Sequence, residues 1–266
     1  MHSSFLLHSP GWRFTLLAFA GFLGGFVNSI AGGGGFIAFP SLLKSGLLPI
    51  QANATTTVAL WPGQFTSIAG YREELRRHLR LVIPVVTVAA IGGAAGAWTL
   101  LHNSQESFLR LVPYLFLMGS TAFAFSGPVS RMVRRRVEQH HNKEHVLLIP
   151  LLISLLAICY YIGYFGAGAG LLTMTALAFC GVERIAEINS LKTVTTTTAN
   201  FVACVTFILH AAVVWHDCWY MMIACAIGGY AGARNSRRVS DKILRPIIIV
   251  FGFVLAIYFF THRKTL

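Results

Sequence analysis

The sequence predicts an all-α, polytopic membrane protein built as an inverted-topology repeat of about five plus five apolar segments. The prediction depends on an apolar composition, long stretches without charge, and an internal repeat. Of the 266 residues, 55% are hydrophobic and 11% are charged, and the mean hydropathy is +0.66. A soluble domain is normally richer in charge, so the chain is expected to lie in a bilayer.

Each copy of the repeat is expected to hold one full span, one short segment and three further spans. In the first copy, residues 12–127, the segments are about 12–30, 35–48, 54–71, 80–101 and 108–127. In the second copy, residues 146–262, they are about 146–165, 169–181, 190–210, 216–233 and 243–262. With about 13 residues, the second segment is too short for a bilayer core of about 30 Å. A broken or half-length helix is therefore expected after each glycine-rich stretch.

The repeat itself is visible as two similar motifs. Ile91-Gly-Gly-Ala-Ala-Gly-Ala97 returns as Ile227-Gly-Gly-Tyr-Ala-Gly-Ala233, and the same offset pairs Asn53 with Asn189 and Thr57 with Thr193. With a slip of one residue, Gly35 pairs with Gly170 and Gly46 with Gly181. Two copies of one unit therefore build the chain, joined by a basic linker, residues 128–145.

Basic loops give the expected orientation. In the first copy the basic loop 72–80 precedes the fourth span, whereas in the second copy the basic loop 234–245 follows it. Because basic loops stay in the cytoplasm, equivalent spans should cross the membrane in opposite directions. The linker would then be cytoplasmic and both termini outside. An alternative treats the short segments as re-entrant, with four spans in each copy.

Charge and cysteine content narrow the function classes. The net charge of +12 comes from Lys and Arg in short loops, so it indicates topology, and no nucleic-acid partner is expected. The five cysteines have no metal-ligand spacing and are expected to be packing residues. Neither a metal site, a cofactor nor a catalytic residue is predicted, and the chain is not expected to be an enzyme.

Four consecutive glycines, Gly32 to Gly35, break an otherwise apolar segment, and Gly166-Ala-Gly-Ala-Gly170 is their counterpart in the second copy. Glycine disfavours continuous helix, and irregular backbone inside a membrane must line a cavity or be covered by protein. Half-helix starts present free N–H groups to an anion. Neutral side chains nearby would orient it, and no acidic residue falls within a predicted span away from its edges. The predicted substrate-binding residues are Asn28, Gly32, Gly33, Gly34, Gly35, Asn53, Thr56, Thr57, Gly166, Gly168, Gly170, Asn189, Lys192 and Thr193.

Other interpretations remain beside this one. The Ile-Gly-Gly motifs are expected to mark close helix contact instead of a ligand site. The threonines either donate to a ligand or bond back to helix carbonyls. Lys192 either extends to the cytoplasmic face or lines the anion path.

Several motifs in one order resemble a known family. They are Asn28-Ser-Ile-Ala-Gly-Gly-Gly-Gly35, Gln51-Ala-Asn-Ala-Thr-Thr-Thr-Val-Ala-Leu-Trp-Pro-Gly63, Ile188-Asn-Ser-Leu-Lys-Thr-Val194 and Ile227-Gly-Gly-Tyr-Ala-Gly-Ala-Arg234. Together they resemble the TauE/SafE family of sulfite exporters over nearly the whole chain. The resemblance implies a multi-pass carrier of the bacterial inner membrane for small sulfur-containing anions such as sulfite, sulfoacetate or other organosulfonates.

The expected function is therefore secondary transport of a small anion by alternating access of the two halves about a midplane site. A passive anion channel or facilitator is the alternative. The expected partners are the anion and the lipid bilayer, and a homo-oligomer remains open.

Overall fold

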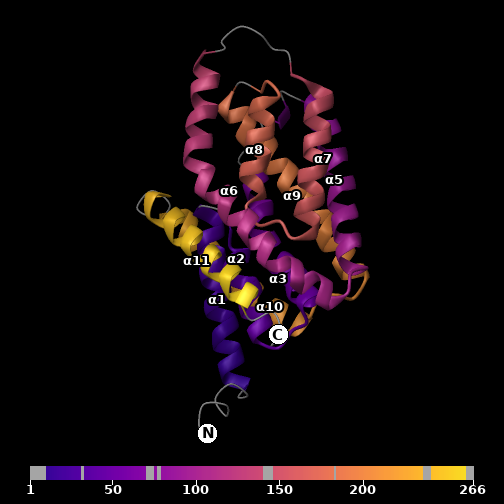
Figure 1. Ribbon diagram of the computed structural model, residues 1–266, viewed down its shortest axis with the longest axis vertical. Coiled ribbons are helices and arrows are strands. Elements are labelled where there is room, and N and C mark those ends of the chain that lie inside the picture. The colour runs from indigo at the N-terminus through magenta and orange to yellow at the C-terminus, as the bar shows by residue number, and fades with distance from the viewer. Residues whose placement is uncertain are drawn as a thin grey trace.

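The computed structural model describes residues 10–30, 33–69, 75–76, 79–139, 146–182, 184–235 and 241–261. Within these ranges the chain forms ten helices and no strand, which confirms the predicted all-helical class (Figure 1). The helices are α1 (Pro10–Ile30), α2 (Gly35–Lys44), α3 (Pro49–Ala69), α5 (Leu79–Leu101), α6 (Gln105–Gln139), α7 (Leu148–Tyr164), α8 (Ala169–Phe179), α9 (Ile185–Leu209), α10 (Trp215–Asn235) and α11 (Asp241–Thr261).

Every predicted apolar segment corresponds to one helix. The short second segments are helices of 10 residues in α2 and 11 residues in α8, as expected for half-length helices. The largest difference is in α6, which continues to Gln139 and so includes much of the sequence assigned to the linker. Arg, Glu and Gln are good helix formers, which explains why the polar end of α6 stays helical.

Left-handed glycines bound both short helices. Gly33 has φ 96° ahead of α2, and Gly168 has φ 77° ahead of α8. After the two helices, Gly46 has φ 97° and Gly181 has φ 96°, and each is followed by an N–H that reaches back into the last helical turn. Residues other than glycine are strained at such backbone angles, so these glycines fix where each half-length helix begins and ends.

Two helix pairs pack with their backbones in contact. In the pair of α1 and α10, a Cβ at Gly25 would overlap the carbonyl oxygen of Cys225, and one at Gly228 would overlap that of Phe22. In the pair of α5 and α7, a Cβ at Gly96 would overlap the carbonyl oxygen of Tyr160. Small residues allow this approach where helices must associate without help from water. The interpretation of the Ile-Gly-Gly motifs as close helix contacts is therefore confirmed.

The two halves meet along α3 and α9, which contact each other, and along α6 and α11. Trp61 Nε1 on α3 donates to the carbonyl oxygen of Thr197 on α9 at 3.4 Å. On the other side of the bundle, Phe116 of α6 stacks on Phe259 of α11, with ring centroids 5.7 Å apart. The core therefore consists of α3 and α9 in contact, with the tight pairs and the short helices packed around them (Figure 1).

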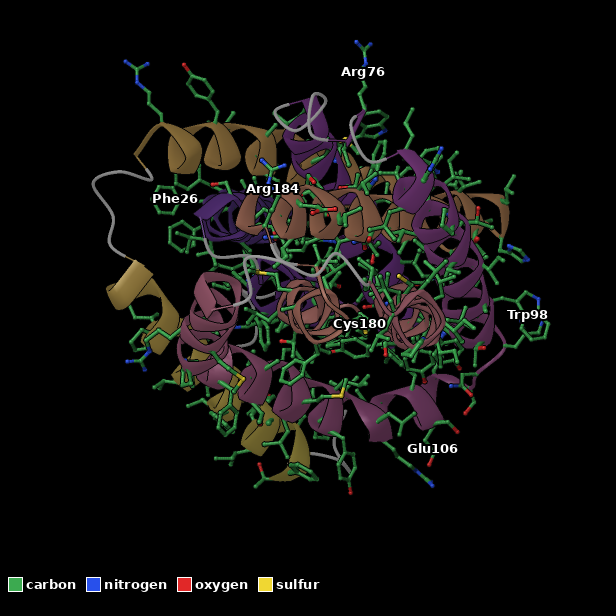
Figure 2. All side chains as sticks on the ribbon, turned by 90° about the horizontal axis from the view of Figure 1, so that it is seen from above. Phe26, Arg76, Trp98, Glu106, Cys180 and Arg184 are labelled. Carbon is green, nitrogen blue, oxygen red and sulfur yellow. The ribbon has the colours of Figure 1, made fainter. Side chains whose placement is uncertain are left out.

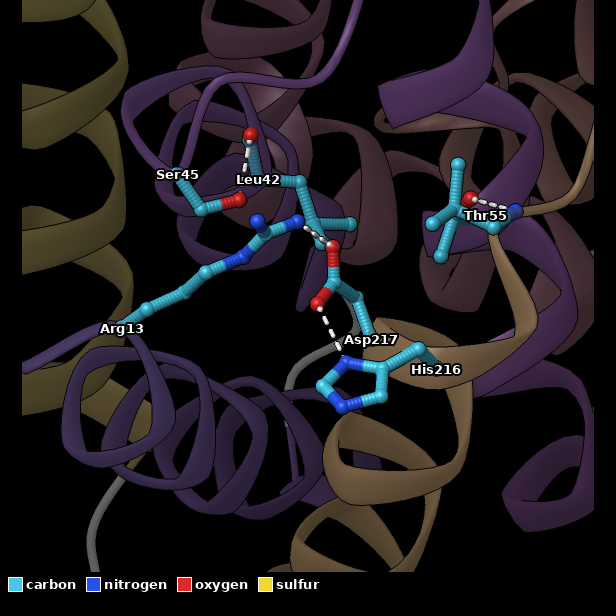
Figure 3. Close-up of polar contacts among 7 residues, drawn as sticks. Arg13, Leu42, Ser45, Thr55, His216 and Asp217 are labelled. Carbon is cyan, nitrogen blue, oxygen red and sulfur yellow. Dashed lines mark hydrogen bonds and ion pairs between the residues drawn. The ribbon is translucent and has the colours of Figure 1, made fainter. Parts of the chain in front are cut away.

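An ion pair whose carboxylate is buried adds a polar contact between α1 and α10. Arg13 donates to Asp217, whose side chain is only 1% exposed, and His216 Nδ1 lies 3.3 Å from the other carboxylate oxygen (Figure 3). Asp217 was expected at the edge of a span, and it does lie in the first turn of α10, but protein covers it completely. Beside it, Val214 N donates to Thr55 Oγ1 and thereby ties the start of α10 to α3.

Large apolar side chains cover the outside of the bundle. Ile149, Tyr230 and Ile257 are each more than 60% exposed, and Trp98 points away from the helices (Figure 2). Among the described residues, α5 is by itself long and apolar enough to cross a membrane. Apolar helices such as α2, α7 and α8 are shorter than such a span requires. An exposed apolar surface of this extent is typical of a protein surrounded by lipid. The five cysteines are buried and free, in agreement with their expected packing role.

Replacing a packing glycine should destabilise the fold. Gly96→Ala places a methyl group against the Tyr160 carbonyl and should lower the free energy of unfolding by about 1–3 kcal/mol, because α5 and α7 must separate. Gly11→Ala is the matched control, since its Cβ would meet nothing within 4 Å. Thermal unfolding of both purified variants in detergent measures the difference, and equal unfolding temperatures would contradict the packing role.

Candidate functional site

A cavity of about 80 Å³ lies where the two halves meet. Its walls come from α1, α2, α3 and α9 and from the segment between α7 and α8. The volume suits a few water molecules or one small anion. The lining residues are Asn28, Gly33, Gly35, Phe39, Asn53, Thr56, Thr57, Leu60, Gln64, Phe165, Gly166, Ala167, Gly168 and Asn200.

The start of α2 faces this cavity. Phe36 N donates to Gly33 O at 3.0 Å and Ile37 N donates to Gly34 O at 3.1 Å. The N–H groups of Phe36 and Ile37 are therefore already paired with the backbone of the glycine stretch. The N–H of Gly35 has no hydrogen-bond partner within the described part of the chain. A Cβ on Gly35 would meet only Thr56 Cγ2, at 4.0 Å, so the backbone here is open to a ligand. Free N–H groups at a helix start favour negative charge.

Thr56 contributes a hydroxyl group that is buried and unpaired. The residue is 5% exposed, and Thr56 Oγ1 has no hydrogen-bond partner among the described residues. Leaving such a hydroxyl unsatisfied costs about 1–3 kcal/mol, so a ligand that accepts its proton would recover that free energy. Thr56 and Gly35 lie side by side, which brings a side-chain donor and a backbone donor to one part of the cavity.

Amide groups supply further polar contacts. Asn53 Nδ2 donates to the carbonyl oxygen of Tyr164 at 3.2 Å, which ties α3 to the end of α7. Asn200 Nδ2 donates to Gln64 Oε1 at 3.1 Å and to Thr196 O at 2.9 Å. These bonds hold amides from both halves against the cavity.

Phenylalanine side chains form the apolar wall. Phe39 and Phe165 line the cavity with ring centroids 5.7 Å apart in an edge-to-face arrangement. Behind them, Phe116 lies 5.4 Å and Phe108 lies 6.4 Å from Phe165. The aromatic cluster closes this side of the cavity against water. The lining side chains, all of them described, are uncharged.

Of the predicted binding residues that the structure describes, eight line the cavity and five do not. Gly34 is packed against α1, where its Cβ would overlap the carbonyl oxygen of Gly24, so Gly35 is the glycine that is open to the cavity. Gly32 lies outside the described residues. The predicted residues that line the cavity are Asn28, Gly33, Gly35, Asn53, Thr56, Thr57, Gly166 and Gly168, and those that do not are Gly34, Gly170, Asn189, Lys192 and Thr193.

Most threonine hydroxyls bond back to their own helices. Thr57 donates to Asn53 O at 2.9 Å and Thr193 to Asn189 O at 2.8 Å, so their protons are already used. Sequence reasoning missed Gln64 and Asn200. Helical spacing from Thr57 through Leu60 to Gln64 could have indicated the first of them, because residues three and four apart share a helix face.

The bundle and its cavity define a class of protein: a helical integral membrane protein with a polar cavity between its halves. The profile of the sulfite exporter TauE/SafE family matches residues 17–259. The chain therefore belongs to the TauE/SafE family, and the resemblance found in the sequence motifs is confirmed.

Curated relatives agree with this family. A "probable membrane transporter protein" of Haemophilus influenzae is 24% identical over 91% of this chain and 92% of its own length. A second protein of that description, from Sinorhizobium, is 27% identical over 92% of both chains. A third, YfcA of Escherichia coli K12, is 25% identical over 91% of this chain and 87% of its own. No solved structure gives a significant match. The chain is accordingly a membrane transporter with a small-molecule substrate.

The unpaired hydroxyl makes a prediction that concerns stability alone. Thr56→Val keeps the shape of the side chain and removes a buried, unsatisfied polar group, so the ligand-free protein should become more stable by about 1–3 kcal/mol. Thr195→Val is the matched control, because Thr195 is equally buried but donates to Leu191 O at 2.6 Å. Chemical or thermal unfolding in detergent compares them. A loss of stability in Thr56→Val equal to that in Thr195→Val would show that Thr56 is paired.

Proposed function

We propose that the protein is a secondary transporter that binds a small, sulfur-containing anion in the cavity and moves it across the bacterial inner membrane by alternating access. The observation that carries the proposal is the pairing of an open helix start at Gly35 with the unpaired Thr56 hydroxyl in a cavity lined by uncharged residues. Donors without negative charge suit an anion, whereas a dehydrated metal cation would need oxygen ligands that bear charge.

The family supports the choice of substrate class. Its description names sulfite export, and a cavity of about 80 Å³ suits sulfite or a small organosulfonate better than a larger metabolite. A tetrahedral or pyramidal oxyanion presents several acceptor oxygens, which matches donors that converge from α2 and α3. The three relatives described above come from bacteria, in keeping with an inner-membrane location.

Contacts between the copies support an inverted repeat. Gln64 and Asn200 hold equivalent positions in the two copies and bond to each other, and so do Trp61 and Thr197. Residues that touch their own counterparts are expected next to a pseudo-two-fold axis. The tight pairs obey the same relation, because α1 and α10 exchange with α7 and α5 when the copies are exchanged. Left-handed glycines at Gly33 and Gly168 also occupy matching positions.

Transport by proteoliposomes tests the function directly. Purified protein should support saturable counterflow of radiolabelled sulfite, because a carrier returns loaded in exchange for internal substrate. Gly35→Val should abolish counterflow without loss of folding, since the side chain would fill space that is now open between Gly35 and Thr56.

Gly11→Val is the matched control, because a Cβ at Gly11 would meet no described atom within 4 Å. Flux that never saturates would favour the channel alternative, and full activity of Gly35→Val would remove the cavity from the transport path.

Topology can be tested by labelling single cysteines with a membrane-impermeant reagent. His102 and Arg131 are exposed, and the native cysteines are buried, so the background should be low. In intact cells, His102→Cys should react and Arg131→Cys should not, because the loop after α5 is expected outside and the end of α6 in the cytoplasm. Reaction of both from one side would reject the inverted topology.

A further inference from the structure

The cavity uses only part of a pseudo-symmetric set of residues. Both members of two equivalent pairs line it, Gly33 with Gly168 and Gln64 with Asn200. Phe165, Gly166 and Ala167 of the second copy also line the cavity. Four further positions of the first copy line it without their counterparts in the second copy. Those positions are Gly35, Asn53, Thr56 and Thr57, and their counterparts Gly170, Asn189, Lys192 and Thr193 do not line the cavity.

The unused half-site has the same local construction as the used one. A Cβ on Gly35 would meet only Thr56 Cγ2, at 4.0 Å, and a Cβ on Gly170 would meet only Lys192 Cδ, at 4.0 Å. In both copies, therefore, an open glycine at the start of a short helix lies beneath one side chain of the following long helix. The chemical difference is at that side chain, where a neutral hydroxyl in one copy corresponds to a lysine in the other.

Lys192 has no ion-pair partner among the residues that the structure describes. It is half-buried on α9, and it forms no ion pair or hydrogen bond through its ammonium group within the described ranges. Its alkyl stem lies over Gly170. A charge inside a membrane-embedded bundle is costly unless it binds a ligand or reaches water. The position of Lys192 beside an open helix start therefore suggests that its ammonium group binds a ligand.

We propose that Lys192 sets the affinity for the anion in the transporter's other conformational state, in which the second half-site lines the cavity. The inference rests on the proposed function, because it requires alternating access by two inverted copies that exchange roles. In the state described here the anion meets the neutral donors of Gly35 and Thr56. In the other state it meets Gly170 and the Lys192 ammonium, so the two membrane faces should bind it with different affinities.

The experiment measures the KM for radiolabelled sulfite from each face of oriented proteoliposomes. Lys192→Thr gives the second half-site the residue found in the first. From one face the KM should rise about tenfold or more, because a hydrogen bond from a charged donor is lost. From the other face it should change by less than about twofold. Lys192→Arg should largely restore the low KM, since it keeps the charge.

Lys44→Thr is the matched control, because Lys44 lies outside the cavity against the ring of Trp12. Lys192→Met keeps a long stem over Gly170 and replaces Lys192→Thr if that variant unfolds. An equal rise from both faces, or none from either, overturns the role of Lys192 while leaving transport intact. A wild-type protein that carries no sulfite from either face would reject the proposed function, and the inference with it.

Discussion

A helix that begins inside an apolar protein leaves N–H groups without partners, and this constraint governs the arrangement around α2 and α8. Both short helices follow a left-handed glycine, Gly33 or Gly168, which turns the chain too sharply for any continuous helix. Water is scarce at such a depth, so the free N–H groups need a polar cavity. The cavity beside Gly35 satisfies this need, and the same groups that require it make it suitable for an anion.

Close packing of the outer helices keeps these breaks in place. The short helices have few residues with which to anchor themselves, so the surrounding spans must be rigid. Backbone contact at Gly25 and Gly96 provides this rigidity in the two tight pairs, and the ion pair of Arg13 with Asp217 adds a directional bond between α1 and α10. The Arg13 side chain is partly exposed, so only the carboxylate of Asp217 carries a full desolvation cost, which the bond from Arg13 helps to offset.

The sequence predicts helices well and the cavity only in part, for a physical reason. Helix bounds follow from composition and glycine position, which are local, and the first residues of α2 and α8 agree with the prediction, although α2 ends four residues earlier than expected. Cavity membership depends on helix rotation and on which copy faces the site. Gly34 and Gly35 are adjacent in sequence, yet one packs against Gly24 and the other is open. No pattern in the sequence separates them, because the distinction arises from the crossing of α1 over α2.

Uncharged donors also suit the cycle that a carrier must complete. A transporter has to release what it binds, so its site must hold the anion firmly enough for selection and weakly enough for departure. A charged donor binds an anion more strongly than a neutral donor does, so the state with the proposed Lys192 contact should release the anion more slowly. In the conformation described here the proposed donors, the hydroxyl of Thr56 and the N–H of Gly35, are neutral, so their hydrogen bonds to an anion should be weaker and its release easier. In this conformation, selectivity for charge in the proposed site would come from the helix start and from the apolar wall of Phe39 and Phe165.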